Sequence, residues 1–184
     1  VKLKVITNVG CKQTISKTIH IAPTPTVNFS NGISCQNDST KFTSLINAPS
    51  YTITNWLWSF GDISSGSANS TSIKNPKHLF SNQTSYTIKL IATNNAGCKD
   101  SISKVIIVKA QVKALFSYSA ACTNAVVRFQ DNSIVPAPAS SNVRNWSFGV
   151  STTSTLVSQY YPLAGTYPVT LTVIGTNGCV SYAV

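Results

Sequence analysis

The stretch Tyr86-Thr-Ile-Lys-Leu-Ile-Ala-Thr-Asn-Asn-Ala-Gly-Cys98 decides how this 184-residue chain folds. From Tyr86 to Ala92 every second residue is apolar, while threonine and lysine hold the positions between, with Ile91 the one exception. A period of two is typical of a strand that buries one face only. Asn95-Ala-Gly97 follows as a turn, because asparagine and glycine tolerate positive φ. The stretch therefore predicts a half-buried strand that ends in a hairpin turn.

The same pattern recurs elsewhere in the chain. Residues Val1–Cys11 match the later part of this stretch, and Tyr167–Cys179 match all of it. Two phenylalanines and a cysteine recur 87 residues later, and a Trp-Ser-Phe-Gly segment recurs 88 residues later. The matching residues are Phe29 and Phe116, Cys35 and Cys122, Phe42 and Phe129, and Trp58–Gly61 and Trp146–Gly149. This self-similarity predicts an internal structural repeat of about 87 residues.

The repeat predicts a division of the chain into three parts. Residues 1–23 are expected to be the C-terminal strands of a first repeat, 24–110 a complete second repeat, and 111–184 a third that stops inside its last strand. Short strands separated by Gly, Pro, Asn and Ser predict an all-β fold of sandwiches. Because the junctions Ala22–Pro25 and Lys109–Lys113 are short, we expect the sandwiches to stack end to end.

Acidic side chains are scarce. The chain has only four acidic residues, all aspartates, against 14 lysines and arginines, for a net charge of +10. Catalysis by paired carboxylates and a calcium cage both need several acidic groups together, so we expect no enzyme and no cofactor. The basic residues are spread along the chain, which disfavours a nucleic-acid partner and leaves either a solvated surface or a weakly positive face. No apolar run is long enough for a transmembrane helix.

The five cysteines are Cys11, Cys35, Cys98, Cys122 and Cys179. They form no close pairs, and the only histidines are His20 and His78, so a zinc site is disfavoured against disulfide bonds. Disulfides imply an oxidising compartment. The chain opens on Val1 rather than methionine and shows no signal peptide, so we expect it to be a piece of a longer protein.

Three segments of the middle part resemble the polycystic-kidney-disease (PKD) repeat family. They are Asn55-Trp-Leu-Trp-Ser-Phe-Gly-Asp62, Asn75-Pro-Lys-His-Leu-Phe80 and Ser85–Gly97. The resemblance implies an immunoglobulin-like sandwich of about seven strands. The chain departs from the family pattern at Ile63, where the family has glycine, and at Val150, which takes the place of Asp62 in the last part.

The added cysteines make the chain resemble PKD arrays of secreted Bacteroidetes proteins. Such proteins are often exported by type IX secretion, and some serve in gliding motility or cell adhesion. The resemblance implies disulfides Cys35–Cys98 and Cys122–Cys179, each within one sandwich. It leaves Cys11 for a cysteine upstream of this segment.

A few side chains are candidates for a role beyond folding. Trp58, Phe60, Trp146 and Phe148 share one strand face and are expected in the cores. Trp56 is replaced by Arg144 in the last part, which predicts a position near the surface, suited to rim packing or to stacking on a sugar. Tyr160 is expected to be exposed and Tyr161 to be in the core.

His78 and Asp62 are expected to serve as hydrogen-bonding residues of the fold, with a weak calcium site at Asp62 left open. The sequence therefore predicts a non-catalytic structural or adhesive region of a large secreted or cell-surface protein. It would act as a stiff spacer whose partners are neighbouring repeats, with polysaccharide or surface proteins as further candidates. The alternative is an accessory spacer or binding module of a secreted hydrolase.

Overall fold

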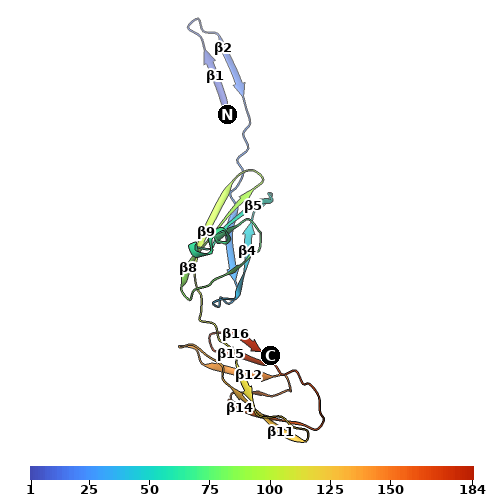
Figure 1. Cartoon of the computed structure of the whole chain (residues 1–184). Coiled ribbons are helices and arrows are strands. Elements are labelled where there is room, and N and C mark those ends of the chain that lie inside the picture. The colour runs from blue at the N-terminus through green and yellow to red at the C-terminus, as the bar shows by residue number, and fades with distance from the viewer.

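The computed structural model describes the backbone of residues 1–184 and the side chains of all of them except Ser141 and Asn142. The elements follow one another along a line, with a hairpin first, then one sandwich, then a second (Figure 1). The strands are β1 (Lys2–Ile6), β2 (Lys12–Ser16), β3 (Thr26–Asn31), β4 (Ser39–Asn47), β5 (Ile53–Ser59), β6 (Ser70–Thr71), β7 (Lys77–Leu79), β8 (Ser85–Asn94), β9 (Lys99–Ile107), β10 (Phe116–Tyr118), β11 (Ala125–Asp131), β12 (Ser141–Trp146), β13 (Ser151–Thr152), β14 (Leu156–Tyr161), β15 (Leu171–Gly175) and β16 (Val180–Ala183). A short 3-10 helix, η1 (Ile63–Asn69), follows β5. No helix in the described part of the chain is long and apolar enough to cross a bilayer.

The first sandwich is built from two antiparallel sheets. One sheet has the strand order β3-β4-β7 and the other β6-β5-β8-β9. Strand β8 buries Tyr86, Ile88, Leu90 and Ala92 and turns the residues between them outward, which confirms the period-two prediction. The pattern decides which face of the larger sheet meets the smaller one.

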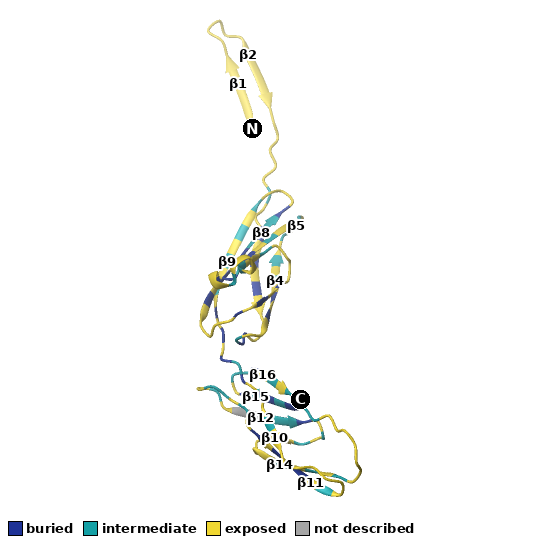
Figure 2. Ribbon diagram, viewed as in Figure 1, coloured by how far each residue is buried: buried dark blue, intermediate teal, exposed yellow. Residues whose placement is uncertain are grey.

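The core of the first sandwich is aromatic. The Trp58 ring lies 5.2 Å from that of Phe29 and 5.7 Å from that of Phe42, measured between ring centroids. Tilted and edge-on contacts of this kind add to the stabilisation from burial. Trp58 is fully buried, and buried residues run through the middle of the unit (Figure 2).

The second sandwich repeats this topology. Its sheets have the orders β10-β11-β14 and β13-β12-β15-β16, in the same succession along the chain as in the first. Trp146 takes the central position, 5.3 Å from Phe116 and 5.5 Å from Phe129 between ring centroids. The all-β fold of end-to-end sandwiches is therefore as predicted.

One predicted strand is shorter than its pattern suggested. The alternation from Tyr167 to Val173 predicted a strand, but β15 begins only at Leu171. In the first sandwich the matching residues Tyr86–Ile88 pair with Lys104–Ile106 of β9. Strand β16 ends at Ala183, which pairs with Leu171, so β16 provides no partner for Tyr167–Val169.

The hairpin of β1 and β2 projects from the first sandwich and is exposed along its length (Figure 2). Its apolar residues Leu3 and Val5 are 59% and 53% exposed. The residues that they match in the repeat, Leu90 and Ala92, are fully buried. The hairpin therefore carries the sequence of a core-forming strand pair with nothing packed on its apolar face.

Candidate functional site

The most unusual feature of the chain is the joint between the two sandwiches. We use this name for Cys35, the linker Lys109–Val112 and the turn Asn177–Cys179. A disulfide joins Cys35 of the first sandwich to Cys179 of the second, with the two Cα atoms 5.9 Å apart. Both cysteines are buried. The two sandwiches are thus tied to each other twice, once through the backbone and once through sulfur.

Hydrogen bonds hold the linker to both sandwiches. On the first side, the Lys109 N–H donates to the Ser34 carbonyl oxygen at 2.9 Å, and the Gln36 N–H donates to the Lys109 carbonyl oxygen at 2.8 Å. On the second side, Asn177 Nδ2 donates to the Ala110 carbonyl oxygen at 2.9 Å, and Lys109 Nζ donates to the Asn177 carbonyl oxygen at 2.7 Å. A linker fixed at both ends does not behave as a flexible tether.

The inside of the joint is apolar. Val112 is buried and packs with the disulfide in a small cluster of its own, separate from the two sandwich cores. Gly178 faces Ile33 of the first sandwich so closely that an added Cβ would lie 2.9 Å from Ile33 Cδ1. The disulfide, the buried valine and the close turn together make a packed contact between the sandwiches.

The disulfide pairing implied by the resemblance is wrong. Cys35 bonds Cys179, while Cys98 and Cys122 carry free thiols, as does Cys11. Cys35 pairs through its backbone with Lys109, where the chain leaves the first sandwich, and β9 separates Lys109 from Cys98. Nine extended residues span about 30 Å, whereas the Cα atoms of a disulfide lie within about 7 Å. A Cys35–Cys98 bridge inside the first sandwich is therefore geometrically impossible.

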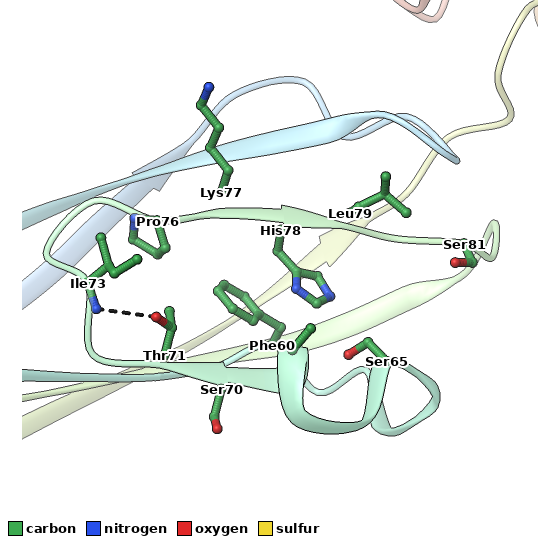
Figure 3. A pocket seen from close by; sticks show the side chains of 11 residues that line it. Phe60, Ser65, Ser70, Thr71, Ile73, Pro76, Lys77, His78, Leu79 and Ser81 are labelled. Atoms are coloured by element: carbon green, nitrogen blue, oxygen red, sulfur yellow. Dashed lines mark hydrogen bonds between the residues drawn. The ribbon is translucent and has the colours of Figure 1, made fainter.

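A buried polar pair lies within the first sandwich. Asp62 Oδ2 lies 3.1 Å from His78 Nε2, and both side chains are buried. The His78 ring stacks on Phe60 with 4.2 Å between centroids, at the side of a cavity of about 440 Å³ (Figure 3). Burial alone would raise the pKa of the Asp62 carboxyl, but hydrogen bonds from Ser64 and His78 outweigh it and lower the pKa below its ordinary value.

The order of these groups matters for chemistry. Ser64 Oγ donates to Asp62 Oδ1 at 2.5 Å, so the carboxylate sits between the serine and His78. A serine nucleophile needs the histidine next to its hydroxyl, to take its proton. The arrangement instead holds η1 against β7, consistent with the hydrogen-bonding role expected for both residues. In the second sandwich Val150 and Gln159 stand at the two positions, so the pair is replaced as a unit.

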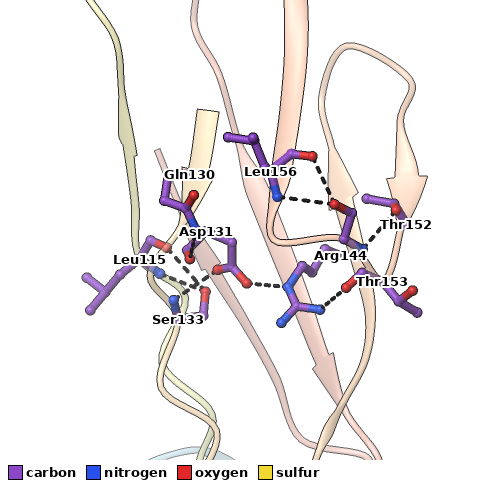
Figure 4. Close-up of polar contacts among 9 residues, drawn as sticks. Leu115, Gln130, Asp131, Ser133, Arg144, Thr152, Thr153 and Leu156 are labelled. Atoms are coloured by element: carbon purple, nitrogen blue, oxygen red, sulfur yellow. Dashed lines mark hydrogen bonds and ion pairs between the residues drawn. The ribbon is translucent and has the colours of Figure 1, made fainter. Parts of the chain in front are cut away.

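An ion pair lies in the second sandwich, where Arg144 stands at the position that Trp56 holds in the first. Arg144 Nε donates to Asp131 Oδ2, and Arg144 Nη1 donates to the Thr153 carbonyl oxygen at 2.7 Å (Figure 4). Burial would raise the pKa of Asp131, but hydrogen bonds from Ser133 and Arg144 outweigh it and lower the pKa. Arg144 is thereby held in the wall of the sandwich rather than free in solvent.

The two aromatic candidates for surface contact lie in different surroundings. Trp56 is half-buried and packs against the first core, with Lys74 Nζ 5.8 Å from its ring centroid. Tyr160 is 51% exposed, and its hydroxyl donates to Asn124 Oδ1 at 3.2 Å. Trp58, Phe60 and Trp146 are buried in the cores and Phe148 is partly buried against the second. Tyr161 also packs against the second core.

Metal-binding residue types do not cluster. Among the side chains that the structure describes, no three His, Cys, Asp or Glu gather at one place. We therefore assign no metal ligands, and the joint remains the site with the most distinctive geometry.

Sequence comparison identifies a domain family for part of the chain. The PKD domain family model matches residues 20–110, so this part of the chain is similar to PKD domains. No curated protein matches the sequence.

Solved structures similar to the chain include two PKD domains. The PKD1 domain of Epp from Vibrio anguillarum is 18% identical, with a TM-score of 0.43, and the match covers 49% of this chain and 99% of that one. The PKD1 domain of the metalloprotease PrtV from Vibrio cholerae is 20% identical, with a TM-score of 0.41, covering 47% and 99%. The fibronectin(III)-like modules of CbhA from Clostridium thermocellum are 11% identical, with a TM-score of 0.45, covering 85% and 89%.

Proposed function

We propose that this chain is a non-catalytic structural region of a larger extracellular protein and acts there as a stiff spacer. The observation that carries this proposal is the Cys35–Cys179 disulfide, which joins two sandwiches rather than the two sheets of one. A bond placed at the joint acts between the two sandwiches. It restricts the bending and separation of neighbouring sandwiches, which is what a spacer requires.

The internal repeat supports a tandem array of PKD units. We propose units at residues 24–110 and 111–184, with residues 1–23 as the last strands of another. The exposed apolar face of β1 and β2 supports this division, because the matching residues of β8 and β9 are core residues. Each unit would extend the array by one sandwich length.

The disulfide also changes how such a spacer carries tension. Cys35 and Cys179 are 144 residues apart in the sequence. When the two ends of the chain are pulled, force passes through the sulfur bridge, and the residues enclosed between the cysteines bear little of it. Most of both sandwiches lies inside this loop, so tension would not draw them out into extended chain.

The disulfide supports an extracellular location, either secreted or attached at the outer membrane, because such bonds form and persist in oxidising compartments. An adhesin exported by type IX secretion, with a role in gliding or attachment, is the specific setting that we propose. The spread of the +10 net charge suits weak, salt-sensitive attraction to anionic polysaccharide.

Contact with polysaccharide or surface proteins would use exposed aromatic side chains. Tyr160 is the more accessible of the two candidates, and Trp56 is half-buried beside Lys74. Glycan-array binding of the wild type, Trp56→Ala and Tyr160→Ala tests this part. Loss of a signal in one variant would support that residue, and equal binding by all three would remove both from the contact surface.

Small-angle X-ray scattering tests the spacer role. We expect an elongated particle whose longest dimension stays the same from pH 6 to 8. In the variant Cys35→Ser with Cys179→Ser, the distribution of interatomic distances should broaden as the joint loosens. The variant Cys98→Ser, which removes a free thiol, should scatter like the wild type. A compact wild-type particle, with the sandwiches folded onto each other, would contradict the proposal.

A further inference from the structure

We propose that Cys122 and Cys98 each form a further disulfide like Cys35–Cys179, with a cysteine of a neighbouring sandwich of the same kind. Cys122 would bond the β15–β16-type turn of a following unit, and Cys98 the Cys35-type cysteine of a preceding one. The inference rests on the proposed function, since it needs neighbours in the array. It turns one disulfide into a continuous covalent connection between consecutive sandwiches.

Cys122 lies in the same local structure as the bonded Cys35. Asn37 and Asn124, each two residues after the cysteine, both have positive φ, 57° and 58°. The Asn37 N–H donates to the Phe80 carbonyl oxygen at 2.8 Å, and the Asn124 N–H donates to the matching Tyr161 carbonyl oxygen at 3.0 Å. The turn that presents the cysteine is therefore built in both sandwiches, and in the second its thiol is exposed.

Cys98 lies in the same local structure as the bonded Cys179. In each turn an asparagine amide binds both the cysteine and the incoming linker. Asn94 Oδ1 accepts from the Cys98 N–H at 2.9 Å, while Asn94 Nδ2 donates to the Pro23 carbonyl oxygen at 3.1 Å. Asn177 Oδ1 accepts from the Cys179 N–H at 3.0 Å, while Asn177 Nδ2 donates to the Ala110 carbonyl oxygen at 2.9 Å.

Pro23 and Ala110 are the same position of the repeat, 87 residues apart. Cys98 Sγ also lies 3.6 Å from the Ala22 carbonyl oxygen, at the position that Lys109 holds in the joint. The segment Ala22–Pro23 therefore contacts the first sandwich as Lys109–Ala110 contacts the second. Cys98 thus lies at the end of the first sandwich that a preceding sandwich would contact.

An open groove beside Cys122 marks the path by which the chain would continue to a following sandwich. The groove has a volume of about 870 Å³. Its lining includes Phe116, Cys122, Phe129, Tyr161, Tyr167 and Val184. In the first sandwich the matching aromatic residues form a closed core with Ile106 and Val108 of the outgoing segment.

We assign the groove to a strand that continues β16 with the pattern of Lys104–Ala110. In the first sandwich that segment runs from β9 into the linker and pairs with Cys35 through Lys109. The same path in the second sandwich would pass Ala121–Thr123, which border the groove. A strand on this path would place the next sandwich beside Cys122, as the linker Lys109–Val112 places the second sandwich beside Cys35.

Formation of each bridge needs a two-electron oxidant, which we take to be a small-molecule disulfide such as oxidised glutathione. One cysteine thiolate attacks a glutathione sulfur, which forms a mixed disulfide and releases one glutathione thiolate. The second cysteine thiolate attacks the cysteine sulfur of the mixed disulfide and releases the other glutathione thiolate. The thiolates released take up the two protons that the cysteines give up.

The test extends the full chain by one sandwich in register. Residues 104–184 are repeated directly after Val184, because Val184 matches Ser103 in the repeat. The protein is refolded in glutathione buffer and quenched with acid, and its free thiols are counted after denaturation without reductant. Non-reducing peptide mapping then identifies the bridges.

The original chain has three free thiols, and the extension adds two cysteines. We expect the extended chain to keep three free thiols, with Cys122 bonded to the second copy of Cys179. Substituting Cys122→Ser in the extended chain should raise the count by one. The matched control Cys98→Ser should lower it by one and leave the new bridge intact.

A count of five, or a map that pairs Cys122 with any other cysteine, overturns the inference. Scattering from the same sample distinguishes a failure of the proposed bridge from a failure of the proposed spacer role. A particle lengthened by one sandwich with a free Cys122 would refute the bridge and leave the spacer standing. A particle that is not lengthened would refute both.

Discussion

Asp62 and His78 show how a polar pair can be exchanged as a unit between similar sandwiches. In the first sandwich they are buried and bonded to each other. In the second, Val150 packs on the core at the matching position, and Gln159 replaces the histidine. Because a buried polar group without a partner is unfavourable, a change at one position favours a change at the other.

This exchange can be tested with a double-mutant cycle in the first sandwich. Asp62→Val should lower the free energy of unfolding by about 1–3 kcal/mol, since it leaves the buried His78 without its partner. His78→Gln should lower it by a similar amount, since it removes the ring that bonds Asp62 and stacks on Phe60. The double variant should lose less than the sum of the two, with a coupling of about 1 kcal/mol or more. Urea unfolding followed by circular dichroism measures all four proteins, and strictly additive losses would show that the pair does not act as a unit.

The lowered pKa of Asp62 predicts a loss of stability in acid. A carboxyl whose pKa is lower in the folded state stabilises the fold above its unfolded pKa, which is near 3.9. That contribution disappears as pH falls through the folded value, so the first sandwich should weaken below about pH 4. Asp62→Asn should be less stable at pH 7 but should lose less on acidification.

Of the three tryptophan indole N–H signals in NMR, those of Trp58 and Trp146 follow the two sandwiches separately, because each of these residues lies in one core. Asp131→Asn is the reciprocal control, since the pKa of Asp131 is also lowered and this residue belongs to the second sandwich. An unchanged acid response of the Trp58 signal in Asp62→Asn would contradict the assignment.

At the scale of elements, the turn after β5 depends on strand β8 behind it. Gly61 has a φ of +66°, and a Cβ there would lie 2.6 Å from the Thr87 carbonyl oxygen. Gly149 at the matching position has a φ of +89° but no atom within 4 Å of an added Cβ. The difference arises because Thr87 lies in a fully paired β8, whereas its counterpart Pro168 precedes the start of β15.

Alanine substitutions at these two glycines form a matched pair. Gly149→Ala should lower the free energy of unfolding of the second sandwich by about 1–2 kcal/mol, from backbone strain alone. Gly61→Ala carries the same strain and also clashes with backbone that cannot move aside, so it should lower the stability of the first sandwich at least twice as much. Thermal unfolding of the two variants beside the wild type measures this, and equal losses would contradict the close contact with Thr87.

The elements also show what could be predicted from the sequence. The alternation in Tyr86–Ala92 predicts strand β8 and its buried face, because a period of two determines which side chains face the core and which face solvent. Repetition of Trp58 and Phe29 as Trp146 and Phe116 predicts two similar cores. The strand over Tyr167–Thr170 was not realised, because a ladder needs a partner strand that no local pattern reveals.

The cysteine pairing was missed for a related reason. Disulfide pairing depends on the end of the sandwich at which each cysteine lies. The family resemblance implied a pairing but did not show at which end each cysteine lies. Chain direction could have supplied it. Each long strand crosses the sandwich once, so Cys35 after β3 lies at the outgoing end and Cys98 before β9 lies at the incoming end. Only cysteines of consecutive sandwiches then meet.

The whole molecule combines these features into a rod with a covalent bond across its joint. The line of hairpin, first sandwich and second sandwich (Figure 1) places the Cys35–Cys179 bond between the two units and not within either. If Cys98 and Cys122 also form bridges to neighbouring sandwiches, the disulfides carry most of the tension. Within this chain, only the backbone between Cys98 and Cys122 would then be under load. An array of this kind would be nearly inextensible while its disulfides are intact.

Single-molecule force extension of the chain, pulled between Val1 and Val184, measures whether the disulfide bridges the two sandwiches. With the disulfide intact, the residues between Cys35 and Cys179 stay outside the force path. Reduction should therefore lengthen the fully stretched chain by about 500 Å, from 144 residues at about 3.5 Å each. The double variant Cys35→Ser with Cys179→Ser should reach the longer value without reductant. Equal stretched lengths for the oxidised and reduced wild type would contradict a disulfide across the joint.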